Sequence, residues 1–216
     1  MIKYEDIRKQ VISTGLKMIN SNMTAGTWGN ISAKIEGEDL MAITPSGVDY
    51  EKITPDGIVI MDFSGNIIDG KMKPSIEFPM HALVYKNRKD AKAVVHTHSV
   101  FASAFAVARK PIPVCCEELA EVAGGSIGVG KYCLPGTKEL GEEVIKALDD
   151  KMAVLIANHG VLACGPTLKE AFKIAEIVEK SAKEIILANI LGGAFELKED
   201  DVKTLRNFYL NSYGQR

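Results

Sequence analysis

The fold is decided by the stretch Val94-Val95-His96-Thr97-His98, which joins a run of apolar residues to two histidines. The segment from Ala91 to His96 is predicted to form a short apolar strand. In an extended segment, residues two apart point to the same face, so both imidazoles can address one ion from the strand end. The motif therefore predicts a strand that ends at a candidate metal site.

A third histidine follows a second apolar run. The segment from Met152 to Ala157 is predicted to be a buried strand, and His159 comes directly after it in Asn158-His159-Gly160. If the two strands end near each other, three imidazoles converge, and three protein ligands with one open position are the pattern of a catalytic zinc site. The alternative is that these histidines are ordinary polar residues at strand ends. Their occurrence after two separate buried strands favours metal binding.

Two further titratable residues belong to a helix predicted over 77–86. Glu77 could be a fourth metal ligand, a general acid/base, or both in turn; the alternative is a solvated acid that favours the positive end of the helix dipole. His81 lies four residues later on the same helical face. We expect it to hydrogen-bond behind the site or simply to pack, and not to bind the ion.

The surrounding pattern predicts an α/β fold. Strand pairs come early in the chain, and helices flank the later single strands, which favours a three-layer α/β/α architecture with a largely antiparallel or mixed central sheet. No linker divides the chain, so residues 1–216 are expected to form one domain. The predicted strands are 31–35, 40–44, 58–61, 67–68, 91–96 and 152–157, and the predicted helices are 5–20, 77–86, 99–108, 137–148, 168–191 and 200–209.

Composition excludes several classes of partner. The net charge is −2 and the basic residues alternate with acids, so neither a nucleic-acid nor a membrane partner is expected. The N-terminus lacks an apolar signal core, and no apolar run reaches the roughly 20 residues that span a bilayer. The four cysteines form no Cys-x-x-Cys pair, and we expect free thiols in a reducing cytoplasm.

Three segments are rich in glycine and hydroxyl groups: Gly26-Thr27-Trp28-Gly29-Asn30, Thr44-Pro45-Ser46-Gly47 and Pro74-Ser75. Glycine lets backbone amides approach an anion closely, and hydroxyl and amide groups donate to phosphate oxygens. Taken singly, a segment of this kind is more often a turn than a phosphate site. None of the three matches the P-loop or a dinucleotide-binding pattern, so the sequence gives little support to a nucleotide enzyme.

In this order, the motifs resemble those of the class II aldolase/adducin-type family, and within it those of the L-fuculose-1-phosphate and deoxypentulose-phosphate aldolases. The resemblance extends nearly from end to end. It rests on Gly-Thr-Trp-Gly-Asn at 26–30, Thr-Pro-Ser-Gly at 44–47, Pro-Ser-x-Glu at 74–77, Val-Val-His-Thr-His at 94–98 and Asn-His-Gly at 158–160.

The resemblance implies a zinc-dependent aldolase that cleaves a ketose 1-phosphate, of fuculose or of a deoxypentulose, to dihydroxyacetone phosphate and an aldehyde. It implies one Zn²⁺ per subunit, although imidazole also accepts Mn²⁺ or Co²⁺. It further implies a C4-symmetric homotetramer with the active site near the subunit interface. By the resemblance, the metal ligands are His96, His98, His159 and Glu77, the catalytic groups are Glu77 and Tyr213, and the phosphate ligands are Thr27, Gly29, Asn30, Ser46, Gly47 and Ser75.

The sequence departs from the fuculose aldolase pattern at two places. Ile76 replaces a second serine, and Cys116-Glu117-Glu118 stands where that enzyme has a catalytic tyrosine. Other activities on this scaffold are pentulose-5-phosphate 4-epimerase, which typically has aspartate at the position of Glu77, and sugar-phosphate dehydratase. A non-catalytic adducin-like domain is a distant alternative, because such domains have lost the zinc histidines.

Overall fold

A computed structural model describes residues 3–215 and is built on an eight-stranded sheet with the strand order β4-β3-β2-β1-β5-β8-β7-β6. Neighbouring strands are antiparallel except for the parallel pair β6 and β7. The strands are β1 (Asn30–Lys34), β2 (Leu40–Ile43), β3 (Val59–Asp62), β4 (Ile67–Asp69), β5 (Ala93–Thr97), β6 (Val129–Gly130), β7 (Ala153–Ile156) and β8 (Gly160–Gly165).

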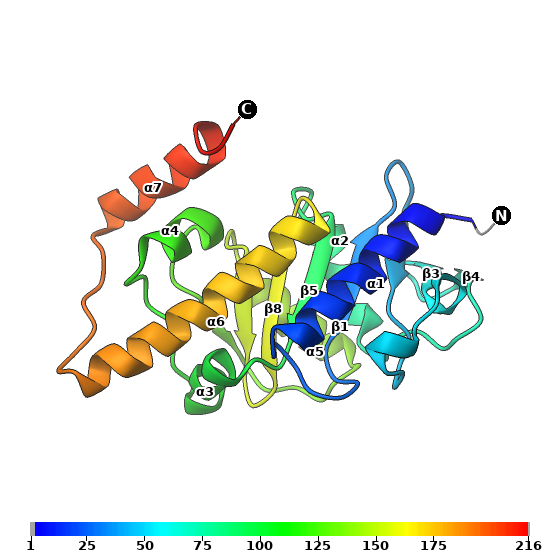
Figure 1. Ribbon diagram of the computed structural model, residues 1–216, viewed down its shortest axis with the longest axis horizontal. Helices are drawn as coiled ribbons and strands as arrows, with labels where there is room; N and C mark the ends of the chain where they lie inside the picture. Colours follow the sequence, from blue (N-terminus) through cyan, green and yellow to red (C-terminus); the bar gives the residue numbers. More distant parts are fainter. Residues whose placement is uncertain (1–2, 216) are drawn as a thin grey trace.

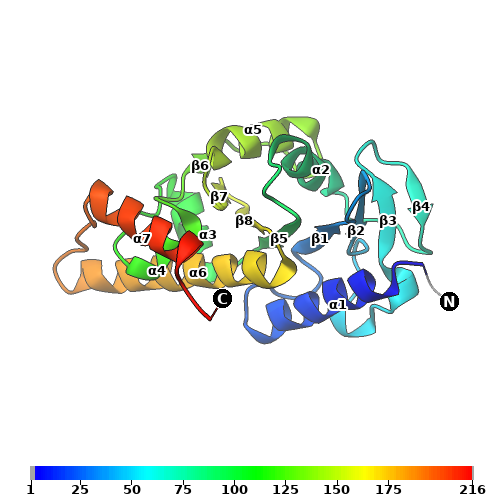
Figure 2. The same cartoon turned by 90° about the horizontal axis from the view of Figure 1, so that it is seen from above.

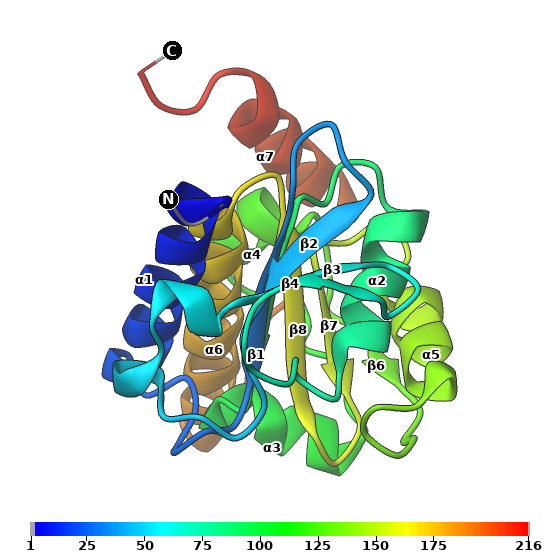
Figure 3. The same cartoon turned by 90° about the vertical axis from the view of Figure 1, so that its right-hand side faces the viewer.

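Helices cover both faces of the sheet, as Figure 3 shows with α1 and α6 on one side and α2 and α5 on the other. The predicted three-layer α/β/α architecture with a largely antiparallel, mixed sheet is therefore confirmed. The helices are α1 (Glu5–Asn20), α2 (Phe78–Asn87), α3 (Val100–Ala108), α4 (Glu117–Ala123), α5 (Lys138–Leu148), α6 (Leu168–Ile190) and α7 (Glu199–Asn211).

Two threonines define the starts of the helices that flank the later strands. The Thr137 hydroxyl accepts a hydrogen bond from the Leu140 amide at the start of α5, and the Thr167 hydroxyl accepts one from the Glu170 amide at the start of α6. Such caps satisfy amides that have no partner within the helix. From its cap, α6 runs across β5, β8 and β7, and α7 turns back over α4 (Figure 1).

The centre of the sheet is the core of the protein. All residues of β5, β7 and β8 are buried, and they pack between α6 and the helices of the other face. Seen from above, β5 and β8 lie between α6 and the pair α2 and α5 (Figure 2). A side chain at the end of β5 is therefore held by rigid, close-packed neighbours.

The sequence patterns did not predict β6, α4 or β8, nor two 3-10 helices, η1 (Tyr50–Lys52) and η2 (Pro55–Gly57). The most important is β8, which begins directly after His159. Its sequence, GVLACG, is buried throughout, so it lacks the alternation that marks a half-exposed strand. The helix predicted from Glu77 begins at Phe78, and Glu77 is its N-cap residue.

Among the described residues, no helix combines the length and apolarity needed to cross a membrane. All four cysteines are free thiols, as the sequence predicted.

Candidate active site

The antiparallel pairing of β5 with β8 brings the three histidines together. His96 lies opposite Leu162, so the end of β5 lies beside the start of β8, where His159 occupies the turn from β7. The Nε2 atom of His96 is 3.2 Å from Nε2 of His159 and 3.1 Å from Nε2 of His98. The predicted convergence of the three imidazoles is confirmed.

The turn that carries His159 depends on two small adjustments of the backbone. Asn158 adopts a positive φ of 54°, a conformation that asparagine tolerates better than most residues. At Gly160 an added Cβ atom would lie 2.3 Å from the Thr97 carbonyl oxygen and 3.1 Å from Cδ2 of His98. The strand can approach the other two histidines this closely only because residue 160 has no side chain.

Hydrogen bonding fixes the tautomer of His96. Its Nδ1 donates to the Val161 carbonyl oxygen at 2.9 Å, and because a carbonyl only accepts, the proton is on Nδ1 and the Nε2 lone pair faces the other two rings. Burial lowers the pKa of His96 well below its ordinary value and, with the nearby His159, lowers the pKa of His98 to about 4. At neutral pH these rings are uncharged donors of lone pairs, which is the form that binds a metal ion.

Glu77 completes this group of donors. Its Oε1 is 3.4 Å from Nε2 of His159, and its Oε2 is 3.4 Å from Nε2 of His96. The side chain is only 8% exposed, and Oε1 has no hydrogen-bond partner although it is buried. A buried carboxylate oxygen without a donor is costly unless a ligand satisfies it. Three imidazoles with one carboxylate fit a divalent cation such as Zn²⁺, Mn²⁺ or Co²⁺.

The second and third candidate phosphate segments lie side by side. An isolated bridge pairs Pro45 with Pro74, and the Ser75 amide donates to the Thr44 carbonyl oxygen at 3.0 Å. Ser46 and Gly47 are exposed, whereas Ser75 is buried and its hydroxyl accepts from the Glu77 amide at 3.2 Å. These residues therefore lie beside the carboxylate that faces the histidines.

The first candidate segment also lies against the histidines. An added Cβ atom at Gly29 would be 2.7 Å from the His96 carbonyl oxygen, and Thr27 is half-buried in the same loop. The Trp28 ring lies 5.8 Å from the His98 ring, centroid to centroid, and is 66% exposed. Tyr50 donates from its hydroxyl to the Gly29 carbonyl oxygen at 2.9 Å and so holds the loop. Sequence reasoning missed Tyr50, since it is an isolated aromatic residue in a polar segment.

Asn30, at the start of β1, is buried between two other residues of the site. Its Nδ2 donates to Oε2 of Glu77 at 2.8 Å, and its Oδ1 lies 2.6 Å from Nε2 of His81. His81 thus hydrogen-bonds behind the site, which agrees with the position expected for it.

Tyr213 is not brought to the histidines within one chain. It is 52% exposed and packs against the rings of Phe208 and Tyr209, and Tyr209 donates to Glu170 in the first turn of α6. That turn follows the end of β8, whereas His159 precedes its start. The two sites therefore lie at opposite ends of the sheet.

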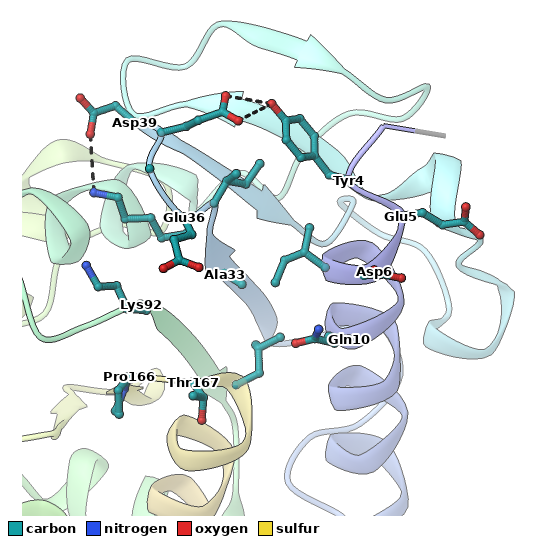
Figure 4. Close-up of a pocket in the computed structure, with 16 residues that line it drawn as sticks. Tyr4, Glu5, Asp6, Gln10, Ala33, Glu36, Asp39, Lys92, Pro166 and Thr167 are labelled. Atoms are coloured by element: carbon teal, nitrogen blue, oxygen red, sulfur yellow. Dashed lines mark hydrogen bonds and ion pairs between the residues drawn. The ribbon is translucent and has the colours of Figure 1, made fainter. Parts of the chain in front are cut away.

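A large cavity of about 1170 Å³ also lies at the end of the sheet away from the histidines (Figure 4). It is bounded by the start of α1, the β1–β2 hairpin and the first turn of α6. The labelled side chains include Glu36, Lys92 and Thr167, and none of the candidate site residues contributes to its wall.

Comparison with known proteins agrees with this geometry. The family described as Class II Aldolase and Adducin N-terminal domain matches residues 9–186. A 5-deoxy-D-ribulose 1-phosphate aldolase of Bacillus thuringiensis serovar kurstaki is 36% identical over 209 residues, which cover 97% of each chain. An L-fuculose phosphate aldolase of Escherichia coli K12 is 38% identical over 177 residues, 82% of this chain and 81% of that protein. A solved L-fuculose 1-phosphate aldolase has a TM-score of 0.93 at 37% identity, covering 97% of this chain and 98% of that one. The chain therefore belongs to the class II aldolase and adducin family.

Proposed function

We propose that this protein is a zinc-dependent aldolase that cleaves a ketose 1-phosphate, of fuculose or of a deoxypentulose, to dihydroxyacetone phosphate and an aldehyde. The observation that carries the proposal is the group of His96, His98 and His159, whose ligand atoms all lie within 4.8 Å of one another, facing the Glu77 carboxylate. The two relatives named for such substrates, each more than 35% identical, support the choice of substrate class.

The chemistry follows from the groups at the site. A divalent cation held by the three imidazoles and Glu77 supplies Lewis-acid polarisation of the ketose carbonyl. As the C3–C4 bond breaks, the C4 hydroxyl passes its proton to solvent and becomes the aldehyde oxygen, while C3 keeps the electron pair. Glu77, after taking up a proton from solvent, delivers it to C3, which completes dihydroxyacetone phosphate. No lysine Schiff base is required.

We assign the phosphate to the segments beside Glu77. Ser46, Gly47 and Ser75 come from two paired segments, and Thr27, Gly29 and Asn30 come from the loop against His96. Backbone amides near glycine and the serine and threonine hydroxyls are suitable donors to a phosphate group. The Asn30 amide already donates to Glu77, so in this assignment its second N–H is the one that is left for substrate.

A role for Tyr213 in handling the aldehyde oxygen requires a second copy of the chain, since within one chain it lies at the far end of the sheet. This supports the proposed C4 homotetramer with the active site near an interface. Exposed apolar side chains surround the histidine end, including Trp28, Ile76 and Val100, each more than 60% exposed. We further propose that residues 1–216 form one domain and that the reaction takes place in the cytoplasm, where the free thiols are stable.

The decisive experiment is a coupled assay for dihydroxyacetone phosphate with five- and six-carbon ketose 1-phosphates. The Glu77→Gln variant is expected to lose about 10²–10⁴-fold in turnover, the usual contribution of general acid–base catalysis. It should retain phosphate binding. Glu36→Gln makes the same change at an exposed residue far from the histidines and should leave turnover unchanged.

Three results would contradict the proposal. A fully active Glu77→Gln variant would remove its acid/base role. Trapping of substrate on a lysine by borohydride would indicate Schiff-base chemistry. Conversion of a pentulose 5-phosphate to its 4-epimer without release of dihydroxyacetone phosphate would identify the epimerase activity instead.

A further inference from the structure

A chain of buried hydrogen bonds runs from the core of the protein to Glu77. The Tyr85 hydroxyl lies 2.6 Å from the Ser32 hydroxyl, which lies 2.7 Å from Nδ1 of His81. On the other side of the ring, Nε2 of His81 lies 2.6 Å from Oδ1 of Asn30, whose Nδ2 lies 2.8 Å from Oε2 of Glu77. All five residues are 6% exposed or less.

The donors and acceptors in this series of hydrogen bonds can be arranged in only one direction. The ionised Glu77 carboxylate only accepts, so the NH₂ end of the Asn30 amide must face it and the oxygen must face His81. An amide oxygen only accepts, so the His81 proton is on Nε2. Nδ1 is then an acceptor and takes the Ser32 hydroxyl proton, which leaves the Ser32 oxygen to accept from Tyr85.

Hydrogen bonding can select one tautomer of His81 only if the ring is uncharged. Complete burial, together with the neighbouring His96, lowers the pKa of His81 to about 3. A buried imidazole that only filled space could be replaced by an apolar ring or chain at similar volume. In this protein, Nδ1 of His81 accepts from Ser32 and Nε2 donates to Asn30. A residue that only filled space would not need both hydrogen bonds.

The two oxygens of Glu77 consequently differ. Oε2 accepts from Asn30, whereas Oε1 has no hydrogen-bond partner and lies 3.4 Å from Nε2 of His159. We propose that His81 is a positioning residue for the reaction: through Asn30 it anchors Oε2 of Glu77 and reserves Oε1 for the ion and the substrate proton. This inference rests on the proposed aldolase function, because it gives Glu77 the proton transfer.

Proton exchange into dihydroxyacetone phosphate isolates that step from carbon–carbon cleavage. In D₂O, Glu77 removes one hydrogen from the hydroxymethyl carbon and a deuteron from solvent replaces it, which ¹H NMR follows directly. His81→Leu removes the donor to Asn30 and should slow exchange at saturating ligand about 10- to 100-fold, as for other groups that support a metal site. The half-saturating concentration and the bound metal should change little, since the phosphate and imidazole contacts remain.

Two matched variants test the assignment. His81→Gln can still donate an N–H toward Oδ1 of Asn30 and should recover most of the exchange rate. Tyr85→Phe removes only the last donor of the chain and should have a smaller effect than His81→Leu. Equal loss of exchange in His81→Gln and His81→Leu, or full exchange in a folded His81→Leu variant, would overturn the proposal.

A spectroscopic measurement on the unmodified holoenzyme tests the role of His81 independently of the proposed aldolase activity. Long-range ¹H–¹⁵N correlation of ¹⁵N-histidine-labelled protein should identify His81 as the neutral Nε2–H tautomer. If wild-type protein does not exchange deuterium into dihydroxyacetone phosphate, the aldolase proposal fails, and the tautomer still decides the hydrogen-bond direction. An Nδ1–H or doubly protonated His81 would overturn the proposed chain even in an active aldolase.

Discussion

The two ends of the central sheet differ in what they bring together. Where β5 ends, His96, His98 and His159 form the one group of three or more His, Cys, Asp or Glu side chains within residues 3–215 that is close enough to share an ion. Where β5 begins, the wall of a cavity of about 1170 Å³ includes several charged side chains, among them Lys34, which lies 3.5 Å from Asp39.

The comparison shows that a large cavity and a group of reactive side chains can lie at different ends of the same sheet. The cavity end offers space, but most of its charged groups, such as Glu36, Asp39 and Lys92, are exposed and can be hydrated. At the histidine end, Oε1 of Glu77 and Nδ1 of His159 are buried without a hydrogen-bond partner. Buried unsatisfied groups indicate a ligand more strongly than an opening in the surface does.

The strongest way to break the comparison is to remove one imidazole. His159→Ala should reduce zinc affinity by more than the roughly 10- to 100-fold typical of residues that only support a metal site. Cleavage of the ketose phosphate should fall with it. Metal content after dialysis, measured by elemental analysis, checks the expectation. Glu36→Ala, at the other end of the sheet, is the control and should keep its metal; equal metal content in both variants would contradict the assigned ligand set.

Gly160→Ala sharpens the comparison without touching a ligand. The new methyl group would lie 2.3 Å from the Thr97 carbonyl oxygen, so β8 and the histidines must shift. Overpacking of this kind costs about 1–3 kcal/mol, and we expect weaker metal binding as well. Gly37→Ala is the control for metal binding, because Gly37 lines the cavity at the other end of the sheet and nothing lies within 4 Å of its added Cβ atom; its φ of 76° adds a backbone cost of its own in thermal unfolding. Thermal unfolding and metal titration of both variants test this; unchanged metal affinity in Gly160→Ala would show that the close approach is dispensable.

Much of the fold could be predicted because the sequence patterns are local. Apolar runs before His96 and His159 gave β5 and β7, and the predicted hairpins are observed as β1–β2 and β3–β4. The strand that aligns the histidines, β8, could not be predicted in this way. It is buried on both faces, so its residues show no alternation, and only the three residues 157–159 separate it from β7.

The candidate metal ligands could be predicted from the sequence, whereas most residues that hold them in place could not. His96 and His98 are two residues apart, and this spacing alone indicates a shared direction. Contacts that join distant parts of the chain leave no such pattern. Examples are the pairing of Asn30 with Glu77 and the distance of Tyr213 from the histidines, which depend on how the sheet and helices pack.

The pH dependence of stability offers a smaller test, centred on His81. In the unfolded chain its imidazole takes up a proton below about pH 6.5, whereas in the folded protein the pKa is lowered to about 3 by burial. Between these values protons bind only the unfolded chain, so stability is lost as the pH falls. The loss approaches about 1.4 kcal/mol per pH unit. Denaturant unfolding at pH 6.5 and 5.0 should therefore show a steeper decline for wild type than for His81→Gln; parallel declines would contradict this origin.

A carboxylate on α6 provides a weaker test of how the histidine end is supported. The two oxygens of Glu179 accept from the Phe101 and Ala102 amides at 2.9 and 2.8 Å, and so cap α3, which begins two residues after His98. Glu179→Gln leaves one amide without an acceptor and should cost about 0.5–2 kcal/mol, the usual range for a lost helix cap. Glu176→Gln is the control, since Glu176 accepts only a long 3.5 Å bond from Ser21. Equal stability of the two variants in thermal unfolding would argue against the cap.

The smallest effect is expected at the cavity end. Lys92 is exposed, and it lies just before β5, at the opposite end of that strand from His96 and His98. Because β5 is buried along its whole length and close-packed, a change in surface charge at its start should not move the histidines at its end. Lys92→Ala should therefore alter stability by less than about 0.5 kcal/mol and leave metal content and cleavage rate unchanged. A loss of cleavage without a loss of stability would mean that the two ends are coupled and that the large cavity takes part in the reaction.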